Sequence, residues 1–188
     1  MQRREFLGAS GAAVSAFSTG CLSITEREDQ PFETSSSAIQ NGDTLPRRFS
    51  CDGAGDSPPF EIRAVPDSAE SIMVTGTVNA GVANQSLFWT LWNVEPDTEA
   101  IPAGLPRTPT VDTLNGARQG RVRLGDVGYE PPCPPPGQRY EFEFQLYALD
   151  SMLDVEGGVT NESAADATEG AVLASERVTV GFERSSQS

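Results

Sequence analysis

The stretch Gly128–Tyr140 reads Gly-Tyr-Glu-Pro-Pro-Cys-Pro-Pro-Pro-Gly-Gln-Arg-Tyr and holds five of the 14 prolines in the chain. Proline fixes φ and lacks a backbone N–H, and the residue before it is pushed toward an extended conformation. The stretch therefore cannot form a helix or a central strand, and we expect a stiff loop of polyproline character. A rigid loop suits the wall of a ligand pocket because little entropy is lost on binding. A proline-rich spacer is the alternative.

The proline-rich stretch runs directly into a segment of strict alternation. Apolar Tyr140, Phe142, Phe144 and Leu146 alternate with polar Glu141, Glu143 and Gln145. A period of two predicts a strand with one buried face. A spacer rarely abuts such a strand, which favours the pocket-wall interpretation of the loop.

Five further segments have the pattern of regular structure. Ser71–Val78 alternates and predicts a strand, whereas Leu87–Val94 is apolar on both faces, which is typical of a central, covered strand. We expect an edge strand over Ala117–Leu124, the one helix over Ala164–Leu173, and a last strand through Val178, Val180 and Phe182. The sequence thus predicts one mostly β domain, in which a large antiparallel sheet packs against a second sheet, with one short C-terminal helix.

The chain is strongly acidic. Its 188 residues carry a net charge of −14, and all 13 basic residues are Arg, because Lys is absent. Such a surface argues against nucleic-acid partners and against anionic membranes. It also suits a salt-rich environment, where charge repulsion is screened, and we predict a halophilic source.

The absence of His excludes several kinds of chemistry. No Ser-His-Asp or Cys-His nucleophile can form, and no His-based metal site. The sequence contains no phosphate-binding P-loop and no dinucleotide fingerprint. Asp52 and Asp56 lie on a Gly-rich loop and could bind Ca²⁺, but solvated turn residues are the favoured interpretation. We therefore expect a protein without cofactor, metal or catalytic residues, rather than an enzyme.

The N-terminus has the features of an export signal. A twin-arginine pattern at Arg3 and Arg4 precedes a weakly apolar run that is too short to span a bilayer. The run ends at Cys21 in a sequence that resembles a lipoprotein cleavage box, and a plain cleaved signal is the alternative. We therefore predict a signal over 1–20, lipidation of Cys21, a disordered tether over 21–37, the β domain over 38–184 and a tail over 185–188. The expected location is the outer face of the cytoplasmic membrane, with a lipid anchor as the only membrane contact, or secretion.

Several motifs together resemble the phosphatidylethanolamine-binding proteins, in particular their prokaryotic Raf-kinase-inhibitor-like branch. The proline-rich stretch is similar to the family's Gly-Tyr-x-Gly-Pro-Cys-Pro-Pro-Pro-Gly…His-Arg-Tyr segment. Phe49–Gly53 followed by Ser57–Pro59, Trp92–Pro96 and Glu169–Ala174 resemble three other family motifs in the same order. The resemblance covers about residues 34–184 and, through four ordered motifs, is specific.

The resemblance also bears on the cysteines. With Cys21 assigned to the anchor, Cys51 and Cys133 remain, and an even pair in an exported protein favours a disulfide. The resemblance implies that these two residues lie close together. Two small buried thiols are the alternative.

The family's small anion pocket is only partly retained. Matching the motifs residue by residue implies a pocket formed by Phe88, Pro132, Pro134, Gln138, Arg139 and Tyr140. Phe88 and Gln138 stand where the family has histidines, and Ala80 stands where it has an aspartate, so we expect weak phosphate binding. Arg139 could compensate with a bidentate contact; a salt bridge is the alternative.

Two functional classes remain open. The first is a binding module for a small phosphate-like or apolar ligand, and the second is a protein-interaction or inhibitor module with an unknown partner. Asn84 and Asn161 begin Asn-x-Ser patterns for glycosylation. Asn84 is the better candidate because it lies beside the expected pocket.

Overall fold

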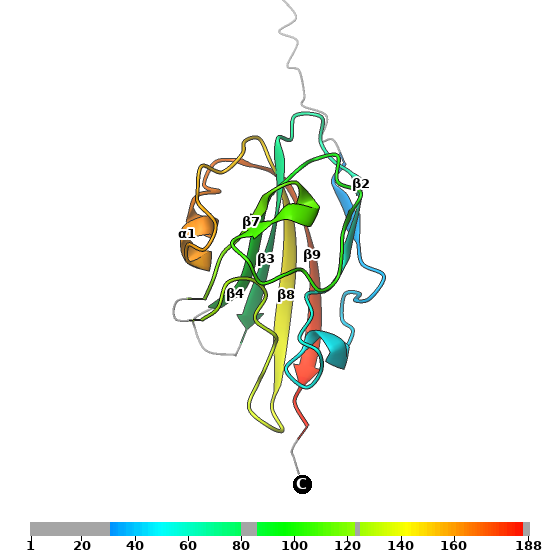
Figure 1. Ribbon diagram of the computed structural model, residues 1–188. Helices are drawn as coiled ribbons and strands as arrows, with labels where there is room; N and C mark the ends of the chain where they lie inside the picture. The colour runs from blue at the N-terminus through cyan, green and yellow to red at the C-terminus, as the bar shows by residue number, and fades with distance from the viewer. Residues whose placement is uncertain (1–30, 80–85, 123–124, 186–188) are drawn as a thin grey trace, which may run out of the picture.

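The computed structural model describes residues 31–79, 86–122 and 125–185. In these residues the chain forms two antiparallel sheets and one α-helix (Figure 1). The strands are β1 (Glu33–Ser35), β2 (Phe60–Ala64), β3 (Ser71–Asn79), β4 (Ser86–Val94), β5 (Ala100–Ile101), β6 (Thr110–Val111), β7 (Ala117–Gln119), β8 (Arg139–Leu149) and β9 (Val172–Glu183). The helix α1 spans Asn161–Asp166, and two short 3₁₀ helices span Arg47–Phe49 and Asp112–Leu114. The predicted fold class, two packed β sheets with one short helix near the C-terminus, is confirmed.

The large sheet has six strands in the order β6-β7-β4-β3-β8-β9, and the small sheet has the order β1-β2-β5. β3 and β8 pair over nine residues, from Ser71 opposite Leu149 to Asn79 opposite Glu141. The alternation of β8 therefore continues across β3, and Phe142, Phe144 and Leu146 form one buried face with Val74.

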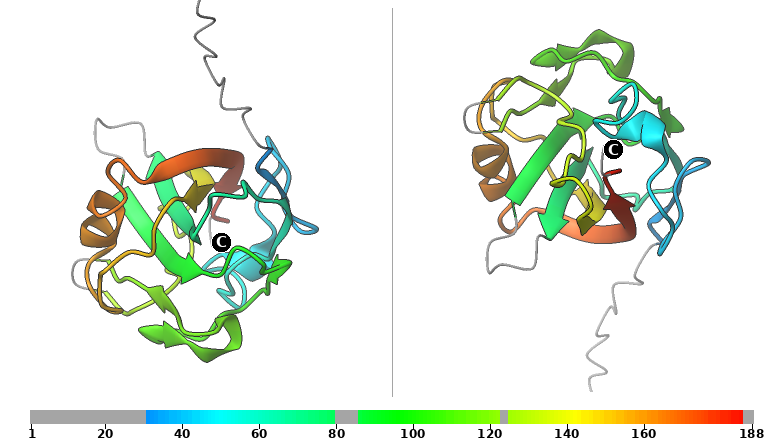
Figure 2. Two further views of the ribbon diagram at one scale, coloured as in Figure 1. Left: turned by 90° about the horizontal axis from the view of Figure 1, so that it is seen from above. Right: turned by 90° about the horizontal axis from the view of Figure 1, so that it is seen from below.

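That buried face packs against the small sheet. Phe60 of β2 contacts Phe144 of β8 with ring centroids 5.8 Å apart, in the main hydrophobic core. The view along the strands shows the small sheet on one side of the large sheet and α1 on the other (Figure 2). Met73 and Trp92 point to the α1 side, where they form a second core with Ala164 of the helix.

The helix lies earlier in the chain than predicted. The Thr160 side chain caps its first turn by accepting a hydrogen bond from the Ser163 amide at 3.2 Å. The helix ends at Asp166, and Gly170 follows with φ of +80°, a conformation that favours glycine. The helix predicted over Ala164–Leu173 is therefore wrong after Asp166, and Val172 already begins β9.

Two other predicted boundaries are wrong. Ala117–Gln119 is shorter than the predicted strand, and it is not an edge, because it pairs with β4 on one side and β6 on the other. The predicted tether over 21–37 includes β1 and buried Phe32, so the fold begins before residue 38. Within the described ranges, no helix is long and apolar enough to cross a membrane.

Candidate functional site

The proline-rich loop is fixed to the rest of the fold at several points. Cys133 forms a disulfide with Cys51, across a Cα–Cα distance of 5.3 Å, and the Cys51 amide donates to the Pro132 carbonyl at 3.2 Å. The Glu130 amide donates to the Phe88 carbonyl at 3.2 Å, and the Tyr129 hydroxyl donates to the Phe49 carbonyl at 2.7 Å. The loop is therefore an ordered wall, as expected from its prolines, and not a spacer.

Phe88 is placed by an irregularity in the β3–β4 pairing. Gly76 pairs with Trp89 while the next residue, Thr77, pairs with Leu87, so Phe88 has no partner of its own. A bulge of this kind changes the direction of a side chain, and Phe88 and Trp89, although consecutive, both join the main core. The Phe88 ring lies over Gly76, where an added Cβ would be 2.6 Å from it.

An aromatic cluster surrounds Phe88. Its ring centroid lies 5.8 Å from Tyr129, 5.8 Å from Phe142 and 5.6 Å from Phe144, in each case edge to face. Edge-to-face contacts add stability beyond the buried area. Phe88 is therefore held firmly at the base of the site.

A pocket of about 340 Å³ opens between this cluster and the proline-rich loop. The described residues that line it are Val78, Ser86, Leu87, Phe88, Val122, Glu130, Pro131, Pro132, Cys133, Pro134, Tyr140 and Phe142. The structure thus brings together four of the six predicted pocket residues: Phe88, Pro132, Pro134 and Tyr140.

Gln138 and Arg139 do not line the pocket. Gln138 is exposed and reaches the site only through Tyr140, whose hydroxyl donates to Gln138 Oε1 at 3.1 Å. The Arg139 guanidinium lies over Gly181 of β9. Because consecutive strand residues point to opposite faces, Arg139 faces away from the cavity that Tyr140 lines. Of the two alternatives left open for Arg139, this position does not support a compensating contact in the pocket.

The described lining of the site is mostly apolar. Among the described lining residues, Glu130 is the one acidic side chain, and none of them is basic. The buried Tyr129 lies beneath the loop, and its burial raises the pKa of the phenol well above the ordinary value. It therefore stays a neutral hydrogen-bond donor. Glu130, Val122 and Phe142 were missed in the sequence, although Glu130 lies inside the quoted stretch and Phe142 follows Tyr140 on the same face.

Other predicted sites differ in their status. Cys21 and Asn84 lie outside the described residues. Asn161 is fully buried, and its Oδ1 accepts from the Thr90 hydroxyl at 2.8 Å, so the folded chain offers no access for glycosylation there. Asp52 and Asp56 pair with arginines. The described residues contain no group of three or more His, Cys, Asp or Glu side chains arranged to hold a metal.

The fold and the site define a two-sheet β sandwich with a proline-walled pocket where β3 ends and where β4 and β8 begin. The sequence profile of the family described as "Phosphatidylethanolamine-binding protein" matches residues 35–183. A "UPF0098 protein" of Pyrococcus horikoshii is 32% identical over 139 residues, covering 73% of this chain and 70% of that protein. A "UPF0098 protein" of Chlamydia muridarum is 32% identical over 157 residues, covering 81% of this chain and 99% of that protein.

Solved structures show the same fold. A putative phosphatidylethanolamine-binding protein homolog from Chlamydia trachomatis superposes with a TM-score of 0.69 at 29% identity, covering 81% of this chain and 97% of that one. Escherichia coli YbcL superposes with a TM-score of 0.73 at 24% identity, covering 81% and 98%. The chain belongs to the phosphatidylethanolamine-binding protein family.

Proposed function

We propose that this protein is a non-catalytic binding protein whose pocket takes a small apolar ligand rather than a phosphate group. The observation that carries the proposal is the lining: aromatic rings and prolines surround the cavity, and the one charged side chain among its described residues is the Glu130 carboxylate. Pockets for apolar molecules have this composition, with few polar groups that fix orientation.

An anion would be disfavoured at this site. Glu130 would repel it, and burying a charge without a partner is costly. Phe88 offers no donor, and the Tyr140 hydroxyl already donates to Gln138. The exposed hydroxyl of Ser86 is the remaining neutral donor among the side chains of the described lining.

Binding assays with probes of contrasting polarity test the proposal. N-phenyl-1-naphthylamine, a neutral fluorophore, should bind with saturation, whereas inorganic phosphate, acetate and phosphorylethanolamine should not compete with it. Tyr140→Ala should weaken probe binding because it removes one aromatic wall. Arg139→Ala is the matched control on the opposite face and should leave binding unchanged. Tight binding of phosphate to the unmodified protein would contradict the proposal.

We further propose that the protein is exported through the twin-arginine route and anchored by lipid on Cys21. The sequence at Arg3 and Arg4, and the small residues before Cys21, support this proposal. Replacing both arginines with Lys should leave the precursor in the cytoplasm. Cys21→Ser should release the exported protein from the membrane, and a Cys21→Ser form that stays fully membrane-bound would argue against the anchor.

A further inference from the structure

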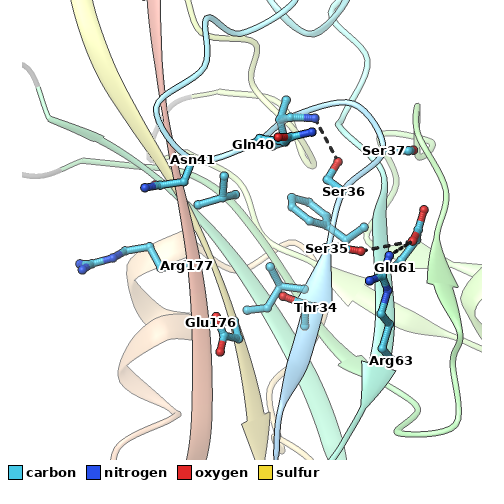
Figure 3. A pocket seen from close by; sticks show the side chains of 14 residues that line it. Thr34, Ser35, Ser36, Ser37, Gln40, Asn41, Glu61, Arg63, Glu176 and Arg177 are labelled. Carbon is cyan, nitrogen blue, oxygen red and sulfur yellow. Dashed lines mark hydrogen bonds and ion pairs between the residues drawn. The ribbon is translucent and has the colours of Figure 1, made fainter.

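A second cavity lies between the edges of the two sheets, separate from the proline-walled pocket. It measures about 540 Å³ and opens between β1 and β9 (Figure 3). Its base is formed by apolar Ile39, Phe60, Leu146 and Val178, and its rim by polar side chains of residues 34–37, 40–41, 61, 63 and 176–177. It shares no lining residue with the proline-walled pocket. We call this cavity the edge groove.

The chain itself already adds an extended segment to one part of the β9 edge. The amides of Gly42 and Leu45 donate to the carbonyls of Thr179 and Gly181 at 2.7 and 2.8 Å. The Gly181 amide donates to the Asp43 carbonyl at 2.9 Å, and Thr44 forms a parallel bridge with Gly181. The C-terminal half of this edge is therefore paired by the protein's own backbone.

The preceding part of the edge has no such partner among the described residues. In an antiparallel strand, residues two apart direct their N–H and C=O groups to the same side. Ser175 and Arg177 therefore direct theirs outward, as Thr179 does, and within the described residues no backbone hydrogen bond from outside the β8–β9 ladder reaches them. These two residues are exposed, and Arg177 lines the edge groove.

The charges of the edge groove also leave one group unmatched. Arg63 pairs with Glu61 at 3.1 Å, and Ser35 donates to the same carboxylate at 3.2 Å. Arg177 pairs with Glu143 at 3.3 Å, and its side chain points away from β1 (Figure 3). Glu176 is exposed and makes no ion pair or side-chain hydrogen bond with another described residue. The groove thus presents, above an apolar base, a carboxylate that no described residue pairs with.

We propose that the edge groove binds a short extended peptide of a partner protein, which adds to β9 beside Ser175–Arg177 and places a basic side chain at Glu176. Strand addition uses main-chain hydrogen bonds for affinity and alternate side chains for specificity. The peptide side chain two residues from the basic one lies on the same face of the peptide. This side chain contacts the apolar base of the groove. A second copy of this chain is a poorer occupant, because each copy carries a net charge of −14 and the two repel.

The test uses the full chain, ¹⁵N-labelled, and the peptide acetyl-Thr-Lys-Thr-Val-Thr-amide at fixed salt. Lys and Val in this probe are two residues apart, as are Glu176 and Val178. Amide signals of Ser175 and Arg177 should shift with saturation, and those of the proline-walled pocket should not. Two N-methylated probes, each with alternate N–H groups blocked, should differ in affinity. The probe whose blocked groups face β9 should bind about tenfold more weakly than the other.

Matched variants separate the groove from general charge attraction. Glu176→Gln should weaken binding of the Lys probe about two- to fivefold, the range of an exposed ion pair. The same variant should not weaken binding of a probe with Gln in place of Lys. Glu169→Gln makes the same charge change at an exposed residue outside the groove and should have no effect.

Three results would overturn the proposal. The first is equal binding of both N-methylated probes, which would exclude strand pairing. The second is the absence of saturable shifts at Ser175 and Arg177, which is also the result expected if another part of the chain fills the groove. The third is a concentration-dependent dimer in sedimentation whose formation shifts these amides without peptide, because it would assign the edge to a second copy.

Discussion

Tyr129 connects the proline-rich loop to the core through one hydroxyl. Its ring stacks on Phe144, with centroids 6.4 Å apart, and its O–H donates to the Phe49 carbonyl. Burial raises the pKa of the phenol, so the folded protein keeps the proton at a pH where the unfolded chain loses it. The stabilisation is complete below the unfolded pKa of about 10 and decreases as the pH rises above it.

We predict that the stability of this protein decreases steeply at alkaline pH. Above about pH 10, the free energy of unfolding should fall by up to about 1.4 kcal/mol per pH unit, the effect of one proton. The chain has no Lys and no His whose titration would overlap with that of Tyr129. Urea unfolding between pH 8 and 11 measures this decrease. Tyr129→Phe should flatten it, whereas Tyr147→Phe should leave it in place.

The Phe88 ring lies so close to Gly76 that the fold depends on a residue without a side chain at position 76. We predict that Gly76→Ala destabilises the fold by about 1–3 kcal/mol, the usual cost of overpacking, because the new Cβ would meet the Phe88 ring at 2.6 Å. Urea unfolding measures the loss. In the Gly76→Ala background, Phe88→Leu should cost less than it does alone, since the smaller side chain leaves room for the methyl group. Strictly additive losses would contradict the contact.

At the scale of elements, the Cys51–Cys133 disulfide and the proline-rich loop act together. The disulfide joins residues separated by 82 positions. In the chain-entropy model, a closed loop of this length contributes about 4–5 kcal/mol. We predict that the double variant Cys51→Ser, Cys133→Ser loses most of this stability and also binds N-phenyl-1-naphthylamine more weakly, because Cys133 lines the pocket.

Thiol counting and thermal melts check this prediction. Mass spectrometry of the unreduced mature protein should show no free thiol at Cys51 or Cys133. Reduction alone should lower the melting temperature of the parent and leave the double variant unchanged. Two free thiols in the unreduced protein would contradict both the bond and its contribution.

The elements also show what could be predicted from the sequence. Local alternation was sufficient for β8, because buried and more exposed residues alternate along most of the strand. β3 was also found from its alternation, although both of its faces are buried over Ser71–Gly76. The helix boundary was missed because the Thr160 cap is a weak signal among neighbouring polar residues. β1 was missed because Glu33–Ser35 has no apolar pattern, and it is held by pairing with distant β2. Non-local pairing of this kind leaves no local trace.

The site was predictable to the extent that it is local. The family resemblance implied Phe88 and Tyr140, and both line the pocket. Arg139 was assigned to the pocket, although the alternation of the same strand already places it opposite Tyr140. The edge groove could not be predicted, because it joins β1 and β9 from the two ends of the fold.

At the scale of the whole molecule, the two cavities lie at different places on the same core. β8 contributes to both, through Tyr140 and Phe142 in the proline-walled pocket and Leu146 in the edge groove. Their linings share no residue, so changes in one should leave the other intact. Tyr140→Ala and Glu176→Gln therefore serve as reciprocal controls for the two binding assays.

The net charge of the whole chain affects the stability of the fold. With 27 acidic and 13 basic residues, at least fourteen carboxylates cannot have an arginine of their own. Two of the arginine pairs, Arg48–Asp56 and Arg63–Glu61, are largely solvent-exposed and contribute little each. Repulsion among the remaining carboxylates therefore opposes the compact state. Because the Debye length falls from about 10 Å at 0.1 M salt to about 3 Å at 1 M, added salt should remove most of this repulsion.

We predict that the free energy of unfolding rises between 0.1 and 1 M KCl and then more slowly, as the screening length approaches the spacing of neighbouring charges. Urea unfolding in a KCl series measures the rise, and a parallel series in sucrose separates screening from exclusion effects, since sucrose carries no charge. A stability that is unchanged at low salt would contradict the prediction, and with it the inference that this surface is adapted to a salt-rich environment.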